Sequence, residues 1–345
     1  MRRVASVFAR RALVAPLVLS QALRHQGGQQ IHRGDIRAEL RAPQGSRPAV
    51  PARGGQQQQQ QEGGEAPEFT PVKPQNSKYV QAETDAATGI ATLKMGRAPV
   101  NSLSLEFFTE FNQWLLWLRS DEAVKSVIIT SAIPLVFSAG LDINELHQPQ
   151  PERMAKFWTA FQEMWLILNS FPKPLIAAIN GNSPAGGCII SLACDFRVMA
   201  RSPKAAPEKL FRIGLNETKL GLVAPPWVMA GYSYVLGHRR AERMLQLGET
   251  PTADEALMIG LVDSVVEEDQ VYATAVKEAS RFMAVPNQAR WMSRDMVRQE
   301  VTAFLRSEEE RDYDTQFFMQ MVNSEEVQKS IGGYLARLSK AAAKK

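Results

Sequence analysis

The sequence predicts an α/β fold in which helices join parallel strands, followed by a C-terminal third that is mainly helical. Between residues 89 and 200, short apolar runs of strand length alternate with segments of helical periodicity. After Gly221 the apolar spacing becomes predominantly helical. The chain has 345 residues, of which 45% are hydrophobic and 22% charged, which is a typical globular composition.

The predicted strands differ in pattern. Residues 89–95 alternate between polar and apolar side chains, and residues 124–130 form a β-branched run. Residues 174–180 are apolar and lie between a proline and a glycine, which indicates a buried strand. Residues 196–200 and 261–266 complete the predicted set.

The predicted helices are marked by periodicity and by capping signals. Apolar side chains recur at helical spacing over residues 103–118 and 154–168, and residues 186–194 read as a buried helix. Capping boxes at Thr252-Ala-Asp-Glu255 and Ser307-Glu-Glu-Glu310 each predict the start of a further helix.

The N-terminal segment is basic and contains no acidic residue before Asp35. Six arginines occur in residues 1–34. An amphipathic, arginine-rich segment of this kind is typical of a mitochondrial transit peptide, and import into the matrix is the expectation. A disordered basic tail and a secretory signal with its apolar core at residues 13–19 are the alternatives.

Residues 35–77 read as a disordered linker rich in glutamine, glycine and proline, with an unbroken glutamine run at residues 56–61. Such a segment buries too little apolar area to offset its ordering entropy. The folded part is therefore expected to comprise an α/β core at 78–266 and a helical region at 267–345.

Charge and composition exclude several functional classes. Outside residues 1–34 the chain has 34 basic and 36 acidic residues, so it lacks the basic balance of a nucleic-acid-binding protein. The sequence has no apolar run of the roughly 20 residues that span a membrane. The two cysteines, Cys188 and Cys194, and the four histidines offer no metal-binding motif.

Three glycine-containing segments are candidate functional sites. The first is FSAGLD at 137–142, the second NGNSPAGGC at 180–188, and the third IGLNETKLG at 213–221, which contains Glu217 among apolar residues. Small residues allow a ligand to approach backbone N–H groups, and a carboxylate on an apolar surface has a raised pKa that suits a general base. Taken singly, the segments are also compatible with a tight turn, close helix–strand packing and a solvated carboxylate.

Together with PVNSLSLEF at 99–107, these segments occur in the order found in the crotonase (enoyl-CoA hydratase/isomerase) superfamily, and from about residue 78 onward the chain resembles its isomerase branch. The resemblance implies a crotonase-type, ClpP-like spiral of repeated ββα units, with a helical C-terminal region that mediates homotrimers. It implies an acyl-CoA thioester substrate, with neither a metal nor a cofactor apart from the coenzyme A of that substrate.

The resemblance also assigns residues. It implies that the backbone N–H groups of Ala139 and Gly186 form an oxyanion hole, and that Glu217 carries a proton from C2 to C4. The reaction expected is the shift of a 3-cis or 3-trans double bond of enoyl-CoA to 2-trans in unsaturated fatty-acid β-oxidation. The residues expected to contact the substrate are Ala139, Gly140, Leu141, Asp142, Ile143, Gly186 and Asn216.

One position separates the expected activities. Hydratases of this superfamily carry a second glutamate one residue after the cysteine of the glycine turn, where this chain has Ile189. Isoleucine cannot activate water, so the resemblance favours isomerisation. The alternatives are another acyl-CoA reaction on the same fold, such as hydration or thioester hydrolysis, and a non-catalytic acyl-CoA-binding scaffold.

Overall fold

A computed structural model describes residues 71–342 of the chain. The predicted segment 1–34 and most of 35–77 lie outside the described residues. At the centre is a six-stranded sheet of order β1-β2-β4-β7-β9-β11, in which β1 and β2 are antiparallel and all other neighbours are parallel. Its strands are β1 (Val80–Thr84), β2 (Ile90–Met95), β4 (Ser126–Ser131), β7 (Leu175–Ile179), β9 (Phe196–Ala200) and β11 (Ser264–Val266).

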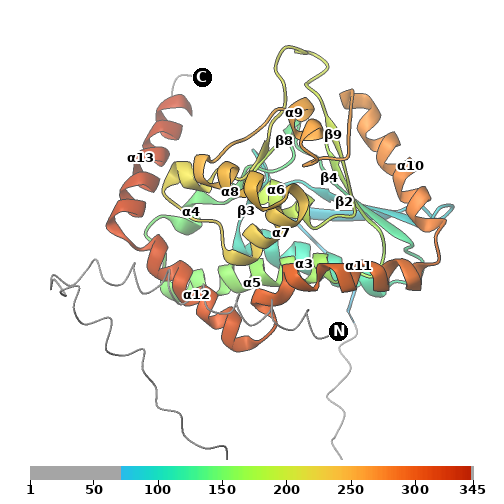
Figure 1. The fold of residues 1–345 in the computed structure, drawn as a ribbon, viewed down its shortest axis with the longest axis horizontal. Helices are drawn as coiled ribbons and strands as arrows, with labels where there is room; N and C mark the ends of the chain where they lie inside the picture. The colour runs from blue at the N-terminus through green and yellow to red at the C-terminus, as the bar shows by residue number, and fades with distance from the viewer. Residues whose placement is uncertain (1–70, 343–345) are drawn as a thin grey trace, which may run out of the picture. The chain divides into compact units, whose positions relative to one another are not determined.

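In sequence order, the strands of two small sheets come between the strands of the large sheet. The order β10-β8-β5 forms a three-stranded parallel sheet, and β3 pairs with β6 in parallel. Their bounds are β3 (Ser102–Leu103), β5 (Leu135–Val136), β6 (Gly140–Leu141), β8 (Gly181–Pro184) and β10 (Ile213–Gly214). A large-sheet strand, a small-sheet strand and a helical segment therefore follow one another repeatedly, which confirms the predicted spiral of ββα units (Figure 1).

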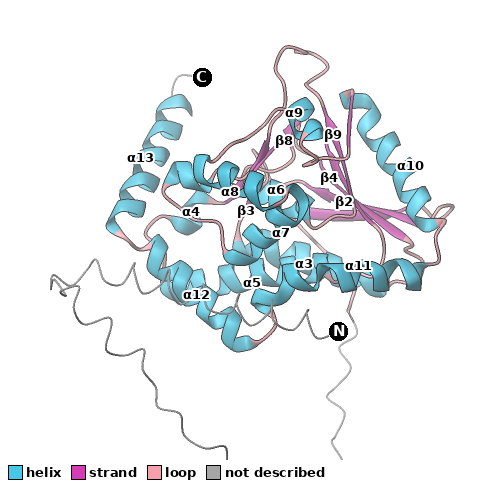
Figure 2. Cartoon of the chain, in the orientation of Figure 1, coloured by secondary structure: helices cyan, strands magenta, loops and turns pink. Residues whose placement is uncertain are grey.

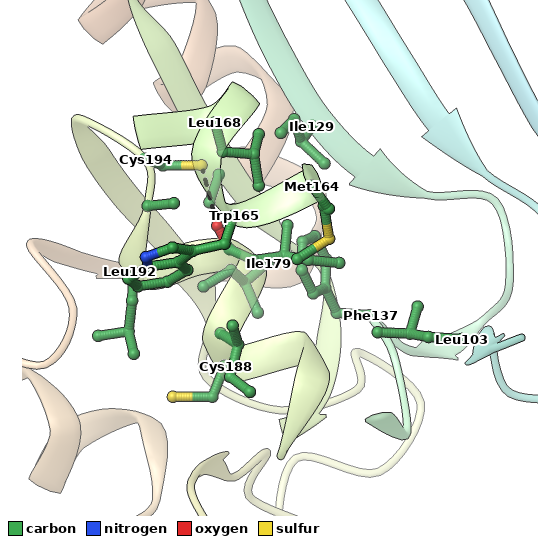
Figure 3. Packing of buried hydrophobic residues seen from close by; sticks show 14 of the residues in the cluster. Leu103, Ile129, Phe137, Met164, Trp165, Leu168, Ile179, Cys188, Leu192 and Cys194 are labelled. Carbon is green, nitrogen blue, oxygen red and sulfur yellow. Dashed lines mark hydrogen bonds between the residues drawn. The ribbon is translucent and has the colours of Figure 1, made fainter. Parts of the chain in front are cut away.

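Helices α3 (Leu105–Ser120) and α5 (Pro151–Asn169) pack against each other, and Figure 2 shows them below the strands in that view. The ring of Phe108 on α3 stacks on Phe161 of α5 at 5.2 Å between centroids. The short helices α4 (Ile143–Leu146) and α6 (Gly186–Leu192) follow the small-sheet strands. Side chains of α5 and α6, among them Trp165 and Cys188, share one apolar core (Figure 3). Aromatic and aliphatic burial of this kind is the main favourable contribution to folding.

The C-terminal part of the described chain is helical, as predicted. Both capping boxes are present, at Thr252 with Glu255 and at Ser307 with Glu310. Helix α10 packs on β4, β7 and β9, whereas α11 packs on α7 and α12 on α5. The elements are η2 (Glu217–Leu220), α7 (Pro226–Leu236), α8 (His238–Leu247), α9 (Ala253–Met258), η3 (Glu268–Gln270), α10 (Val271–Met283), α11 (Asn287–Thr302), η4 (Ala303–Leu305), α12 (Glu308–Val322) and α13 (Glu325–Ala342).

The structure shortens two predicted elements. The predicted strand at 261–266 pairs only over Ser264–Val266, and the predicted helix at 186–194 ends at Leu192. Strand β1, the four-residue strand β8 and the two-residue strands were not predicted; strands of two residues are too short to show a periodicity. Among residues 71–342, no helix is both long and apolar enough to cross a membrane.

Candidate active site

The small parallel sheet β10-β8-β5 brings the three predicted segments together. The FSAGLD segment follows β5, the glycine turn follows β8, and the segment with Glu217 follows β10. Leu135 pairs with Gly181, and Ile213 pairs with Ser183, all in parallel. Because parallel strands end at the same edge of a sheet, all three segments emerge on one side. The candidate active site is therefore built by strands that pair over only two residues each.

The glycine turn and the FSAGLD segment approach each other backbone to backbone. A Cβ atom at Gly186 would lie 3.0 Å from Gly140 Cα and 2.5 Å from Leu103 Cδ1. Gly140 has φ +92°, a conformation that favours glycine, and a Cβ there would lie 3.0 Å from the Gly186 nitrogen. Only glycines at 140 and 186 fit this approach, which brings the two segments close enough to share one small acceptor.

Gly186 begins α6, so its N–H has no acceptor within the helix. Among residues 71–342 it has no other backbone acceptor either. Gly186 is buried. The structure thus places an unpaired N–H donor at the position predicted for one half of the oxyanion hole.

The prediction that Ala139 supplies the second free donor is wrong, because the Ala139 N–H donates to the carbonyl of Val100 at 2.9 Å. The Asp142 N–H donates to the carbonyl of Leu103 at 3.0 Å, across the pairing of β6 with β3. N–H groups alternate in direction along a strand, so the N–H of Leu141, next to Asp142, points away from β3. Leu141 therefore replaces Ala139 as the second candidate donor.

Glu217 opens the short helix η2 and is half-buried. Burial raises its pKa to about 7. Among residues 71–342, no hydrogen bond or ion pair of its carboxylate with another side chain offsets this effect. Burial and then the negative charge of Glu217 raise the pKa of the Cys188 thiol, which places the carboxylate near the start of α6. The geometry combines a carboxylate of nearly neutral pKa with backbone donors, as enolate chemistry requires.

Tyr232 of α7 is a neighbour of Cys188 and Glu217 that the sequence did not indicate. Its side chain is fully buried, and its pKa is raised by burial and then by the charges of Cys188 and Glu217. Tyr232 follows Glu217 by 15 residues in a helix with a high apolar content, and the sequence held no signal to single it out.

The other predicted site residues have structural partners or border the site. Asp142 accepts from the Asn144 N–H at 3.0 Å, which caps α4, and pairs with Arg97 at 2.7 Å. Its carboxylate is thus engaged in holding the turn. Ile143 is the half-buried first residue of α4, and Asn216 precedes η2 without a capping side-chain bond.

Ile189 lies one turn into α6 and is 2% exposed. It therefore presents an aliphatic side chain inside the protein at the position where a hydratase carries its second acid. Glu145, an acidic neighbour in sequence of the FSAGLD segment, is engaged with Arg153 at 2.6 Å and accepts from the Leu105 N–H. Glu217 is the carboxylate of this site that has no such partner.

Helix α13 packs against both η2 and α4 (Figure 1). The side-chain amide of Gln328 donates to the carbonyl of Leu146 at 2.9 Å and accepts from the Gln148 N–H at 2.8 Å. The C-terminal helix thus borders the Glu217 segment and the FSAGLD segment of its own chain.

A separate basic cleft of about 1060 Å³ lies beside α8 and α9. Arg212, Arg240 and Arg243 are among its lining residues, and Lys219 is its only contribution from η2. Its lining includes neither Glu217 nor the two backbone donors, so this cleft is distinct from the candidate active site.

Comparisons with known proteins agree with this geometry. The family model for enoyl-CoA hydratase/isomerase matches residues 85–342. The chain belongs to this family. It is 44% identical over 262 residues to human "Enoyl-CoA delta isomerase 1, mitochondrial", which covers 76% of this chain and 84% of that protein. The mouse protein of the same name is 43% identical, with 76% and 88% covered.

Solved structures and a hydratase relative place the chain within the family. The crystal structure of human mitochondrial delta3-delta2-enoyl-CoA isomerase matches with a TM-score of 0.72 at 43% identity, covering 76% of this chain and 99% of that chain. The "Short-chain-enoyl-CoA hydratase" of Clostridium acetobutylicum is 29% identical over 202 residues, covering 59% of this chain and 74% of that protein. The similarity to isomerases is therefore greater and more extensive than that to this hydratase.

Proposed function

We propose that this protein is a Δ3,Δ2-enoyl-CoA isomerase that shifts a 3-cis or 3-trans double bond of enoyl-CoA to the 2-trans position. The observation that carries the proposal is Glu217, a half-buried carboxyl with a pKa of about 7 in a segment that leaves the same edge of the small sheet as the two donor segments. Its ordinary partner in a hydratase, a second acid, is replaced by the buried Ile189. One carboxylate that can both take and return a proton is sufficient for double-bond migration.

The mechanism begins when the Glu217 carboxylate removes a proton from C2 of the substrate. The C2–H electron pair then forms a dienolate, whose negative charge resides largely on the thioester oxygen. The N–H groups of Gly186 and Leu141 donate to this oxygen, and donors aimed at a developing oxyanion contribute about 3 kcal/mol each. Since neither donor is a side chain, the stabilisation depends on how the backbone is held.

The second step returns the proton from Glu217 to C4. The dienolate electrons restore the C=O bond, C2 and C3 become doubly bonded, and a new C4–H bond forms, so no atom or electron is gained or lost. A pKa near the working pH suits a group that must accept and then donate the same proton. Ile189 provides no group that could activate water, which protects the intermediate from hydration.

The substrate provides its own carrier group, and we propose that the reaction uses no cofactor besides this coenzyme A. The backbone from Ala139 to Ile143 would border the coenzyme A arm, with Asn216 on the Glu217 side. Among these residues, Asp142 acts through the turn, because its carboxylate is engaged with Arg97 at 2.7 Å.

The test is a spectroscopic assay of the purified full chain with 3-enoyl-CoA and, separately, with 2-trans-enoyl-CoA. We expect the first to be converted to the conjugated 2-enoyl product and the second not to be hydrated. Rapid hydration of the second substrate would contradict the role of Ile189. Release of free thiol would identify a thioesterase, and binding without turnover would identify a scaffold.

The N-terminal composition and the relatives named as mitochondrial support a location in the mitochondrial matrix. The test is a fluorescent reporter fused to residues 1–34. Import into the matrix of intact cells supports the proposal, and a reporter that remains cytosolic or is secreted contradicts it.

We further propose that the C-terminal helical region mediates a homotrimer. Exposed apolar side chains gather on α11 and η4, where Met296 is 68% exposed, Val297 58% and Phe304 45%. A second copy would remove this surface from water. Sedimentation should give a trimer for the full chain and a smaller species for Met296→Glu; a monomeric parent protein would contradict the proposal.

A further inference from the structure

Asn101 lies between β2 and β3, at the centre of the segments that lead to the candidate oxyanion hole. It is fully buried, and its backbone adopts the left-handed conformation with φ 49°. Its side-chain amide donates toward the carbonyl of Phe137 at 3.0 Å, the Ser131 hydroxyl at 2.7 Å and the carbonyl of Met95 at 3.3 Å. Its side-chain oxygen accepts from the Arg97 N–H at 2.7 Å. One side chain thus connects the ends of β2 and β4 with the start of the FSAGLD segment.

Ser138 extends this hydrogen-bonded connection to Gly140, the residue before the candidate donor Leu141. Its hydroxyl is fully buried, donates to the carbonyl of Asn101 at 2.8 Å and accepts from the Gly140 N–H at 3.1 Å. The next N–H along the chain belongs to Leu141. The backbone from Phe137 to Gly140 is therefore held by Asn101 and Ser138 directly before the N–H of Leu141, which points away from β3.

We propose that Asn101 and Ser138 are positioning residues that aim the Leu141 N–H at the thioester oxygen. The inference rests on the proposed function, because it concerns the oxyanion hole of that reaction. Asn101 contacts no reacting atom; it acts through the backbone it holds. A backbone donor cannot be adjusted by rotating a side chain, so its direction must come from groups that fix the loop.

Because the Asn101 amide is buried, its removal is expected to shift the backbone around it. A variant that lacks the amide leaves the carbonyls of Met95 and Phe137 and the Ser131 hydroxyl without this donor, in a region closed to water. The relaxation that follows would move the segment between β5 and β6, because Phe137 is its first residue. The Gly186 donor lies on another element and would keep its place.

Two substitutions separate the amide from the backbone conformation. Asn101→Gly removes the amide and still tolerates the left-handed backbone. Asn101→Ala removes the amide and also disfavours that backbone conformation. Ser138→Ala leaves the Asn101 side-chain bonds intact and removes the two hydroxyl bonds, to the Asn101 carbonyl and from the Gly140 N–H. The matched control is Asn112→Ala, since Asn112 is also buried and donates to a backbone carbonyl, that of Ala160, between α3 and α5.

The decisive readout is the enolate of bound acetoacetyl-CoA, which absorbs in the near ultraviolet and forms when the oxyanion hole stabilises it. We expect the parent protein and Asn112→Ala to show this band at saturation, and Asn101→Gly and Ser138→Ala to lose most of it. For isomerisation, kcat should fall by about 10²-fold in Asn101→Gly and by about tenfold in Ser138→Ala, with little change in KM.

The outcomes distinguish this inference from the proposed function. A full band and an unchanged kcat in Asn101→Gly would overturn the positioning role, as would an equal loss in the Asn112→Ala control. If the parent protein forms the enolate but does not isomerise 3-enoyl-CoA, the proposed function fails, while loss of the band in the two variants still supports the positioning role. Thermal melting curves verify that each variant is folded.

Discussion

The two ends of the short helix α6 differ in how their backbone groups are hydrogen-bonded. At its first residue, the Gly186 N–H has no backbone acceptor among residues 71–342. Beyond its last turn, the Ala193 carbonyl accepts from both Arg294 and Arg298, and the Cys194 carbonyl accepts from Arg298. We call the first end open, because its N–H has no backbone acceptor in the described chain, and the second end paired, because the carbonyls of Ala193 and Cys194 accept from arginines.

The paired end is built by α11, whose arginines at positions 290, 294 and 298 recur one turn apart and surround the buried Asp195. Burial and then the charge of Arg294 lower the pKa of Arg298 to about 10. Burying charge is costly unless it is paired and hydrogen-bonded, and here carbonyl groups supply most of the acceptors. The comparison teaches that one short helix can keep an unpaired N–H at its first residue while arginine side chains pair the carbonyls that follow its last turn.

The largest effect on catalysis is expected from Glu217→Gln, which changes the carboxylate near the open end of α6. The amide cannot accept the C2 proton, so kcat should fall by about 10³-fold while acyl-CoA affinity is retained. Kinetics with 3-enoyl-CoA and a binding titration measure the two quantities. Glu249→Gln is the matched control, because that carboxylate pairs with Arg243 at 3.0 Å outside the site. A Glu217→Gln variant with parental kcat would contradict the assignment of the base.

Gly186→Ala tests the close approach of the two donor segments. Its Cβ would lie 2.5 Å from Leu103 Cδ1 and 3.0 Å from Gly140 Cα, so the backbone must shift. We expect kcat to fall by about 10²-fold through loss of one aligned donor. Gly333→Ala is the control, because its Cβ would meet nothing within 4 Å. Equal kinetics for both variants would show that alignment at Gly186 does not matter.

Arg294→Met tests the paired end. It leaves Asp195 without its closest ion-pair partner and removes a donor from the carbonyls of Leu168 and Ala193, of which Ala193 keeps its bond from Arg298. The free energy of unfolding, measured with urea, should fall by about 3 kcal/mol, with kcat of the folded protein largely retained. Arg239→Met, whose partner Glu242 is exposed, should change stability by less than about 0.5 kcal/mol. A catalytic loss without a loss of stability would reverse the roles assigned to the two ends.

The smallest effect on kcat/KM and on stability is expected when only the pH is changed. Because Glu217 must be ionised to act and has a pKa of about 7, kcat/KM should rise by about tenfold per unit below pH 7 and level off above it. The folded state binds this proton more tightly than the unfolded state, whose carboxyl has its ordinary pKa of 4.5. Its contribution to stability is therefore present at low pH and is lost as the pH rises through 7.

Glu217→Gln removes this titration, so the melting temperature of the parent protein should fall relative to that of the variant between pH 5 and pH 8. Parallel melting temperatures across this range, or a kcat/KM profile that is flat through pH 7, would contradict the raised pKa.

Several features followed from local sequence because they depend on neighbouring residues alone. The capping boxes at Thr252 and Ser307 were correct, since each needs one hydroxyl and one carboxylate three residues later. The strands at 174–180 and 196–200 were correct because buried parallel strands are predominantly apolar; the second is interrupted only by Arg197. The Gly186 donor was implied by the resemblance to the superfamily, and the glycine turn before a helix was compatible with it.

The assignment of Ala139 failed for an equally physical reason. Which N–H in FSAGLD is free depends on the register of β6 against β3, and these strands pair over only two residues. Composition carries no information about such a register. The cluster of Asp195 with Arg294 joins residues 99 apart in the chain, and the connection of Asn101 with Phe137 joins residues 36 apart. Neither leaves a local pattern.

The sequence by itself determined the α/β class and the helical C-terminal region, because residue type and short-range periodicity encode these properties, whereas the role of Glu217 and the meaning of isoleucine at position 189 came from the resemblance to the crotonase superfamily. Only the tertiary structure decided that Leu141 replaces Ala139 as a candidate donor, that burial raises the pKa of Glu217, and that Asn101 is hydrogen-bonded to the segment that leads to Leu141. Those properties arise from strand register and from removal of water, which depend on segments distant in the chain.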